Sequence, residues 1–225
     1  MTLREERKQQ TRQSLLQAAL KLAGGGRSLA SLGLREITRE AGVVPTAFYR
    51  HFGDMDELML ALVDEVTLTL RRLLREARVT ALGSPHFVIQ SSVQIFLDFV
   101  RANPRAFEIL AQERGGANAR VREAINREVR FFVGELAEDL RLFPPMGGFP
   151  AEDREMIADL VINTALTQAG EILQLPQREK GAQNRREQEL TVRIIKQIRL
   201  IFLGAAHWQA DRGAVVLGEP AVKSG

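Results

Sequence analysis

The sequence predicts an all-α protein, and two observations carry this expectation. Apolar residues recur at helical spacing through most of the 225 residues, in segments longer than strands. No segment shows the sustained alternation of apolar and polar residues that a half-buried strand requires. Two short helical segments follow the first helix near the N-terminus, whereas most segments in the rest of the chain are long. This difference predicts a small helical head followed by a larger helical body.

The first helix of the head is expected at residues 4–23. Leu16 and Leu20 belong to an apolar stripe at helical spacing along it. The glycines at 24–26 end this helix, because glycine reaches the left-handed conformation without steric cost. A connector at 28–33 leads to the next helix.

Two shorter helices complete the head. Residues 34–41 form the second helix, which stops at Gly42, and the chain turns at 43–44. Pro45 suits the first position of the third helix, where its missing N–H costs nothing. Two short helices joined by such a turn are typical of a helix-turn-helix. The predicted domains are a helix-turn-helix head at 1–53, a helical body at 54–212 and an irregular tail at 213–225.

The third helix has two faces when it is projected at about 100° per residue. Phe48 and Phe52 fall on one side, and we expect both rings to lie in the core. The other side is small, polar and basic, which suits entry into a DNA major groove about 12 Å wide. Its residues, with Tyr49 at the boundary between the faces, are Thr46, Ala47, Tyr49, Arg50 and His51.

Each side chain on this polar face has a possible contact with DNA. Thr46 and Ala47 can approach base edges, and Arg50 can pair with guanine or with a phosphate. Tyr49 and His51 can donate to phosphates, although a structural or solvent-exposed histidine is the alternative for His51. Four more basic residues of the head complete the candidate DNA-binding set, namely Arg4, Lys8, Arg12 and Arg35.

The charge distribution agrees with a DNA-binding head. The whole chain carries a net charge of only +3. Residues 1–53 hold nine Lys and Arg against four acidic residues, whereas the remainder holds 22 against 24. A basic head on a slightly acidic body favours contact with a polyanion, although a solvated basic surface would have the same composition.

The body is expected to begin with a long helix. Asp54 is placed as its N-cap, and Glu57 follows three residues later, as in a capping box. Residues 55–79 continue without a break, and a helix of about 24 residues spans about 36 Å. Such a helix can connect the head to a distant pocket. Further helices are expected at 84–102, 105–116, 118–143, 151–173 and 185–209, with a break at Asn103–Pro104 and a loop at 144–150.

Bulky apolar side chains concentrate in the middle helices of the body. They are either plain core or the lining of a tunnel for an acyl chain, whose burial contributes roughly 0.8 kcal/mol per methylene. Arginines on the same helices either meet phosphates of a ligand or are simply solvated. The candidate ligand-binding residues are Ile95, Phe96, Phe99, Phe107, Leu110, Arg114, Phe131, Phe132, Ile162 and Leu166, with Arg101, Arg105, Arg120 and Arg122 as further phosphate partners.

The last two helices are predicted to form a homodimer interface. They are apolar on more faces than a peripheral helix needs, and small residues on the first of them permit close helix approach. Two helices from each subunit would make a four-helix bundle. A dimer places its recognition helices about 34 Å apart and implies a palindromic operator. The candidate interface residues are Ala165, Ala169, Gly170, Ile194, Ile198, Ile201, Phe202 and Trp208.

Several functional classes find no support in the sequence. The chain has no cysteine, which excludes disulfides and thiol catalysis and suits the reducing cytoplasm. No run approaches the ~18 apolar residues of a membrane span, and no N-terminal segment reads as a signal peptide. The histidines are isolated, and no glycine-rich phosphate loop follows a strand. We therefore expect no metal, no cofactor and no enzymatic activity.

One stretch resembles a known family. The segment LREITREAGVVPTAFYRHFGDMDEL, at 34–58, is similar to the DNA-binding domain of TetR-family transcriptional regulators, and the resemblance covers about residues 1–60. Three positions depart from the family pattern. Relatives carry a glycine where this chain has Thr46, a basic residue where it has Gly53 and a lysine where it has Met55. The matching residues are Leu34, Arg35, Ile37, Ala41, Gly42, Val43, Phe48, Tyr49, His51, Phe52 and Leu58.

Within that family the chain most resembles fatty-acid regulators of the FabR and DesT type. This closer resemblance rests on the same head segment, on VDEV at 63–66 and on NPRAFEILAQERGG at 103–116. The resemblance implies a repressor of unsaturated fatty-acid synthesis or desaturase genes, with long-chain acyl-CoA or another acyl thioester as effector. Two alternatives stay open: a TetR-like repressor of an efflux or detoxification operon that senses another hydrophobic compound, and a helical lipid- or partner-binding protein without DNA binding.

Overall fold

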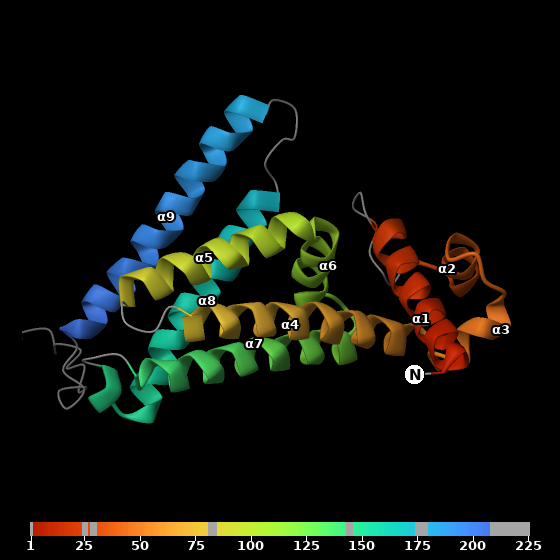
Figure 1. The fold of residues 1–225 in the computed structure, drawn as a ribbon, viewed down its shortest axis with the longest axis horizontal. Helices are drawn as coiled ribbons and strands as arrows, with labels where there is room; N and C mark the ends of the chain where they lie inside the picture. Colours follow the sequence, from red (N-terminus) through yellow and green to blue (C-terminus); the bar gives the residue numbers. More distant parts are fainter. Residues whose placement is uncertain are drawn as a thin grey trace, which may run out of the picture.

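The computed structural model describes residues 2–23, 27, 31–80, 85–142, 146–173 and 180–207, although the side chains at 77–80, 85–89 and 180–184 fall outside that description. Throughout these ranges the regular structure is helical and no strand occurs, so the predicted all-α class is confirmed. The small head and the larger body are visible in Figure 1, where α4 runs from the head into the body. The predicted tail at 213–225 and the interface candidate Trp208 lie outside the described residues.

The head consists of α1 (Leu3–Leu22), α2 (Leu34–Glu40) and α3 (Pro45–Phe48). Pro45 begins α3 as predicted, and Gly42 takes a φ of 70° in the turn before it. That φ lies in the left-handed region, which favours glycine over any other residue.

The third helix is shorter than the sequence predicted. Regular α-helical structure ends at Phe48, and the chain continues through turns at 49–51. The amide of His51 donates to the carbonyl of Phe48 over 2.8 Å, which is the tighter i→i−3 bonding common at helix ends.

The body contains six α-helices among the described residues. Helix α4 links it to the head, and a short 3₁₀ helix, η2 (Met146–Gly148), follows α7 within the segment predicted as a loop. The α-helices are α4 (Met55–Thr80), α5 (Pro85–Ala102), α6 (Pro104–Arg114), α7 (Ala119–Leu140), α8 (Ala151–Leu173) and α9 (Lys180–Ala206).

Helix α4 begins close to where the sequence placed its cap. The Oδ1 atom of Asp54 accepts a hydrogen bond from the amide of Glu57 over 2.7 Å, as an N-cap side chain should. The carboxylate of Glu57 reaches back to the amide of Gly53 over 2.5 Å, one residue earlier than in a capping box. The first turn of α4 is therefore held firmly to the residues that follow the helix-turn-helix.

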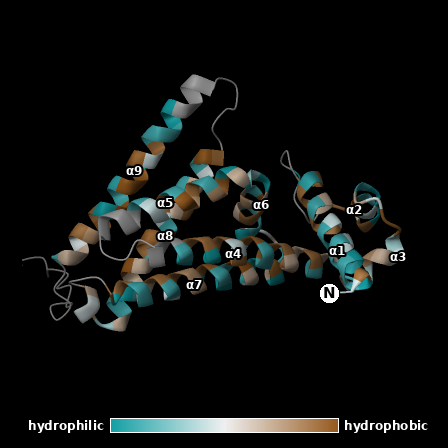
Figure 2. Ribbon diagram, viewed as in Figure 1, coloured by the Kyte–Doolittle hydropathy of each residue, from teal (hydrophilic) through white to brown (hydrophobic). Residues whose placement is uncertain are grey.

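Within the described ranges, the apolar residues gather in three buried clusters. In Figure 2, hydrophobic and hydrophilic residues mix along the helices, as expected where one face is buried. Phe48 and Phe52 are buried in the first cluster, which confirms that both rings belong to the core. This cluster also takes in Leu58 and Leu62 of α4 and Ile125 of α7. The core of the head thus continues past residue 53 and joins the head to the body.

Candidate DNA-binding surface and ligand cavity

The polar face of the third helix is presented to solvent. Thr46 and Arg50 are exposed, whereas Ala47 and His51 are half-buried. Tyr49 is 63% exposed, and its ring meets the buried ring of Phe48 edge-on at 5.7 Å. The four aromatic rings of this segment therefore serve two purposes: the phenylalanines hold the helix in the core, and Tyr49 and His51 lie toward its surface.

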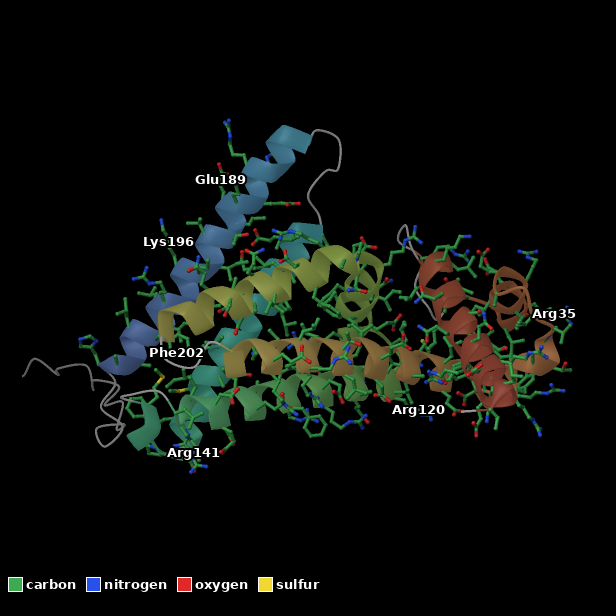
Figure 3. All side chains as sticks on the ribbon, in the orientation of Figure 1. Arg35, Arg120, Arg141, Glu189, Lys196 and Phe202 are labelled. Carbon is green, nitrogen blue, oxygen red and sulfur yellow. The ribbon has the colours of Figure 1, made fainter. Side chains whose placement is uncertain are left out.

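The other predicted DNA-binding residues differ in exposure and in their contacts with neighbouring side chains. Arg4 and Lys8 are exposed on α1, and Arg35 is exposed on α2, where Figure 3 shows it near the end of the head farthest from the body. Arg12 is instead held in place: its guanidinium lies 5.4 Å from the centre of the Phe52 ring and 3.9 Å from the carboxylate of Glu65. Arg12 thus adds positive charge to this region from a fixed position.

His51 sits among positive charges. Its pKa is lowered from the ordinary value, first by burial and then by the positive charges of Lys8, Arg12 and Arg50. The imidazole is consequently mostly neutral at pH 7 in the free protein, because the ordinary pKa of histidine is already about 6.5. The same three side chains make this surface attractive to a polyanion.

A second site lies inside the body. Helices α4 to α9 enclose a largely apolar cavity of about 550 Å³. Of the predicted ligand-binding residues, the cavity wall includes Phe96, Phe107, Leu110, Arg114, Phe132, Ile162 and Leu166.

Three predicted ligand-binding residues do not reach this cavity. Phe99 is buried in the core with its ring edge-on to Phe107 at 5.8 Å, and Ile95 packs against the same cluster. Phe131 is 50% exposed on α7, with the guanidinium of Arg71 5.3 Å from its ring centre. The prediction for these three residues is corrected: two belong to plain core and one to the surface.

The residues predicted for the dimer interface lie mostly on the inner sides of their helices. Six of the predicted interface residues point inward from α8 and α9 and line the cavity. A seventh, Ile201, is half-buried against the core. The exposed apolar side chains of the two helices form another set, which sequence reasoning missed. The six inward residues are Ala165, Ala169, Gly170, Ile194, Ile198 and Phe202. The exposed set is Met156, Leu160, Val192, Leu200 and Leu203, of which Leu203 also borders the cavity.

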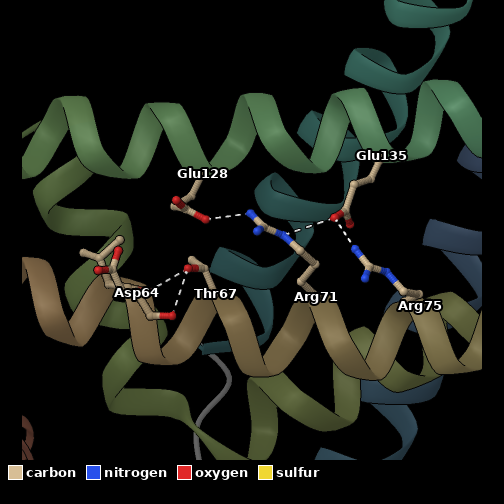
Figure 4. A network of polar contacts seen from close by, with 7 residues as sticks. Asp64, Thr67, Arg71, Arg75, Glu128 and Glu135 are labelled. Atoms are coloured by element: carbon tan, nitrogen blue, oxygen red, sulfur yellow. Dashed lines mark hydrogen bonds and ion pairs between the residues drawn. The ribbon is translucent and has the colours of Figure 1, made fainter.

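A charged network joins α4 to α7 beside the cavity (Figure 4). The carboxylate of Glu128, a residue on the cavity wall that is 8% exposed, lies 2.7 Å from the guanidinium of Arg71. Glu135 lies 3.5 Å from the same guanidinium and 2.7 Å from that of Arg75. Arg71 also stacks near the ring of Phe132 at 5.5 Å. The negative charges of two carboxylates and the positive charges of two guanidinium groups therefore neutralise one another at the boundary of the cavity.

The arginines considered as phosphate partners are mostly engaged elsewhere. Arg101 pairs with Asp98 and Glu187, and Arg120 pairs with Asp54 and Asp56. Arg122 donates to the carbonyl of Gly116. Arg105 is exposed and does not belong to the cavity wall. Arg114 does border the cavity, where it donates to the Oδ1 atom of Asn163 over 3.1 Å. Arg199, which was not predicted, borders it as well.

Membrane spans and metal sites are both absent from the part of the chain that the structure describes. None of its helices has the length and apolar character needed to span a membrane. The described residues also contain no cluster of three or more His, Asp or Glu side chains that could hold a metal ion.

A helix-turn-helix head on a helical body with an internal apolar cavity defines a ligand-responsive class of DNA-binding regulator. Two family matches agree with this. Residues 15–62 match the family described as bacterial regulatory proteins, tetR family. Residues 85–200 match the family described as tetracyclin repressor-like, C-terminal domain. The chain belongs to the TetR family of transcriptional regulators, which are not enzymes, and this membership sets aside the alternative of a protein without DNA binding.

Solved structures share this fold at low sequence identity. A transcriptional regulator from Rhodococcus sp. Rha1 superposes with a TM-score of 0.67 at 21% identity, covering 88% of this chain and 99% of that one. The fatty acid degradation regulator FadR from Bacillus halodurans gives 0.65 at 16% identity, covering 88% and 97%. SmeT in complex with triclosan gives 0.66 at 20% identity, covering 86% and 90%.

Proposed function

We propose that this protein is a cytoplasmic repressor that binds a palindromic operator and whose DNA affinity changes when a long-chain acyl thioester, such as acyl-CoA, enters the cavity. The genes it would control are those of unsaturated fatty-acid synthesis or fatty-acid desaturation. The observation that carries the ligand class is the cavity itself: about 550 Å³, lined chiefly by apolar side chains. Its volume falls within the roughly 300–1,000 Å³ typical of small-molecule sites.

The cavity wall matches an acyl chain in chemistry. Phe96, Phe107 and Phe132 line it, and each buried methylene of a ligand would contribute roughly 0.8 kcal/mol. Arg114 offers a charged donor for the polar end of the ligand. The structural similarity to a fatty acid degradation regulator and the resemblance of the head to the FabR and DesT type support the same ligand class.

The exposed apolar side chains of α8 and α9 are the proposed dimer surface. Leu160 on α8 and Leu200 on α9 are both exposed, and the two helices pack against each other. A second copy of the chain would cover them by forming a four-helix bundle. Sedimentation of the purified protein measures this directly, and a monomer at micromolar concentration would contradict it.

Long-chain acyl-CoA should change the affinity of the protein for its operator by about 5- to 150-fold, the range of ordinary allosteric coupling. Gel-shift titrations with palmitoyl-CoA and oleoyl-CoA measure the effect, because straight and bent chains can stabilise different cavity shapes. If the protein binds operator DNA normally and neither thioester changes that affinity, the ligand assignment fails.

A matched pair of variants connects this effect to the cavity. Leu166→Trp should abolish the acyl-CoA response, because Leu166 lines the cavity and the larger ring occupies its space. Leu68→Trp should retain it, because Leu68 is exposed on α4 and does not border the cavity. Equal responses from the two variants would place the ligand elsewhere.

Operator affinity should also rise as pH falls from about 8 to about 6, through His51. The imidazole is largely neutral in the free protein, because burial and its basic neighbours lower its pKa. A phosphate beside it would raise that pKa, so binding takes up a proton and is favoured at low pH. This gain in operator affinity is lost as the pH rises through the pKa that His51 has in the DNA-bound form.

Fluorescence anisotropy with labelled operator measures this pH dependence. The slope should not exceed about tenfold in affinity per pH unit for each proton taken up, or about a hundredfold for a dimer that takes up one proton at each of its two heads. His51→Gln should flatten it, whereas His207→Gln, at the far end of α9, should leave it unchanged. A slope that persists in His51→Gln would remove His51 from the phosphate contact.

A second candidate function is a repressor of an efflux or detoxification operon that senses another hydrophobic compound. The observation in its favour is the structural similarity to SmeT, whose structure contains triclosan. Thermal-shift measurements with triclosan and with palmitoyl-CoA discriminate between the two functions. Stabilisation by triclosan together with no response to acyl-CoA would favour this second function.

A further inference from the structure

The turn between α6 and α7 contacts the start of α4. The Nδ2 atom of Asn118 donates to the Oδ1 atom of Asp56 over 2.7 Å. The guanidinium of Arg120 lies 3.3 Å from the carboxylate of Asp56 and 3.6 Å from that of Asp54. These contacts join residues that are more than 60 positions apart in the chain. In Figure 3, Arg120 lies where the body meets the head.

The turn itself is tightly built. The Oδ1 atom of Asn118 accepts from the amide of Val121 and so caps α7. The guanidinium of Arg122 donates to the carbonyl of Gly116 over 2.6 Å. A Cβ atom at Gly116 would lie 2.7 Å from the Glu113 carboxylate and 3.2 Å from its backbone. A displacement of the end of α6 would therefore carry the turn with it.

The other side of the contact leads directly to the DNA-binding surface. Asp54 caps α4, and Glu57 holds the amide of Gly53. Phe52, the last buried ring of the head segment, comes immediately before Gly53. The Asp54 and Asp56 carboxylates thus belong to the same first turn of α4 that is bonded to the end of the helix-turn-helix segment.

Helix α6 also forms part of the cavity wall. Phe107, Leu110, Ala111 and Arg114 all line the cavity, and Arg114 is the last residue of α6 before the turn. A ligand that pushes on α6 therefore acts on the turn without an intervening element. The turn has the ligand cavity on one side and the start of α4 on the other.

We propose that Asn118 and Arg120 are positioning residues that transmit occupation of the cavity to the DNA-binding head through Asp56 and Asp54. Movement of the end of α6 shifts Asn118 and Arg120, and the first turn of α4 follows because its carboxylates are bound to them. The proposal rests on the proposed function in requiring a ligand in the cavity, but it does not require an acyl thioester.

Stability is a poor measure of this role, because Arg120 and Asp54 are both mostly exposed and such ion pairs contribute little to folding. The informative variant is Asn118→Asp. It keeps an acceptor for the amide of Val121, so the cap of α7 survives. It also removes the donor to Asp56 and places two carboxylates side by side.

The reciprocal exchange provides a rescue. In Asp56→Asn/Asn118→Asp the amide and the carboxylate change places, so the same hydrogen bond forms in the opposite direction. Arg127→Gln is the matched control, because Arg127 is exposed on the same helix and lies outside this contact.

The first measurement is the ratio of operator affinities with and without ligand, using palmitoyl-CoA and triclosan as probes. Asn118→Asp should reduce this ratio by about 2- to 30-fold. The affinity of each probe for the DNA-free protein should stay unchanged, and the exchange variant should recover any fall in the midpoint of thermal unfolding. The exchange variant should restore the ratio, and Arg127→Gln should resemble the wild type.

The second measurement needs no ligand. Spin labels at Arg35→Cys and Arg141→Cys, in labelled protein diluted with unlabelled protein, give the distance from head to body within one protomer. Asn118→Asp should shift or broaden that distance distribution, and the exchange variant should restore it. If neither probe binds, the result would count against the proposed ligand and not against the positioning role of Asn118 and Arg120. A distance distribution unchanged by Asn118→Asp, or an unchanged ligand ratio, would overturn the positioning role.

Discussion

Replacing Phe48 by alanine should destabilise the head by about 3–5 kcal/mol, the usual loss for removal of a fully buried phenylalanine. Phe48 has 0% exposure, and its ring lies 5.6 Å from that of Phe52 and 5.7 Å from that of Tyr49. The cavity left behind would lie directly beneath the surface that is proposed to meet DNA. Urea unfolding followed by circular dichroism measures the loss.

Tyr49→Ala is the matched control for this substitution. Tyr49 is the next residue but is mostly exposed, so its removal should change the free energy of unfolding by no more than about 0.5 kcal/mol. It should nevertheless weaken operator binding, since a phosphate donor is lost. Equal destabilisation by the two substitutions would contradict the division of this segment into a buried face and a DNA-facing one.

Arg71→Met should destabilise the body by about 3 kcal/mol, because it leaves a buried carboxylate without its partner. Glu128 is nearly inaccessible, lines the apolar cavity and has the guanidinium of Arg71 2.7 Å away. The lost stacking of that guanidinium near Phe131 and Phe132 adds to the cost. Chemical unfolding monitored in the far ultraviolet measures the change.

Two further variants separate the charge effect from a general effect of methionine. Arg72→Met replaces an exposed neighbour on α4 and should stay within about 0.5 kcal/mol of the wild type. Arg71→Met/Glu128→Leu removes both charges and should recover most of the loss, since an apolar pair commonly replaces a buried ion pair at little cost. A double variant as unstable as Arg71→Met would show that the carboxylate is not the cause.

The head was largely predictable from the sequence because its signals are local. Pro45 begins α3, and Gly42 takes the left-handed conformation that its position in the turn requires. The spacing of Phe48 and Phe52 placed both rings in the core correctly. The early end of α3 was missed, because helical spacing is compatible with both α-helical and tighter hydrogen bonding over a few residues.

The body was less predictable because its signals are not local. Ile194 and Ile198 are as apolar as Leu200, yet the first two line the cavity and the third is exposed. A helix with apolar side chains on two sides does not reveal which side meets its own protomer. Phe107 and Phe99 likewise have the same chemistry, and only the placement of the neighbouring helices makes one a wall residue and the other core.

Tyr49 is the only tyrosine of the chain, and the sequence holds a single tryptophan, Trp208. The exposure of the Tyr49 ring on the surface proposed to meet DNA therefore makes it an intrinsic fluorophore at the place where binding would occur. A Trp208→Phe variant would leave its emission free of overlap from indole. Quenching of that emission would then report on the recognition event itself, without a dye and without altering the surface under study.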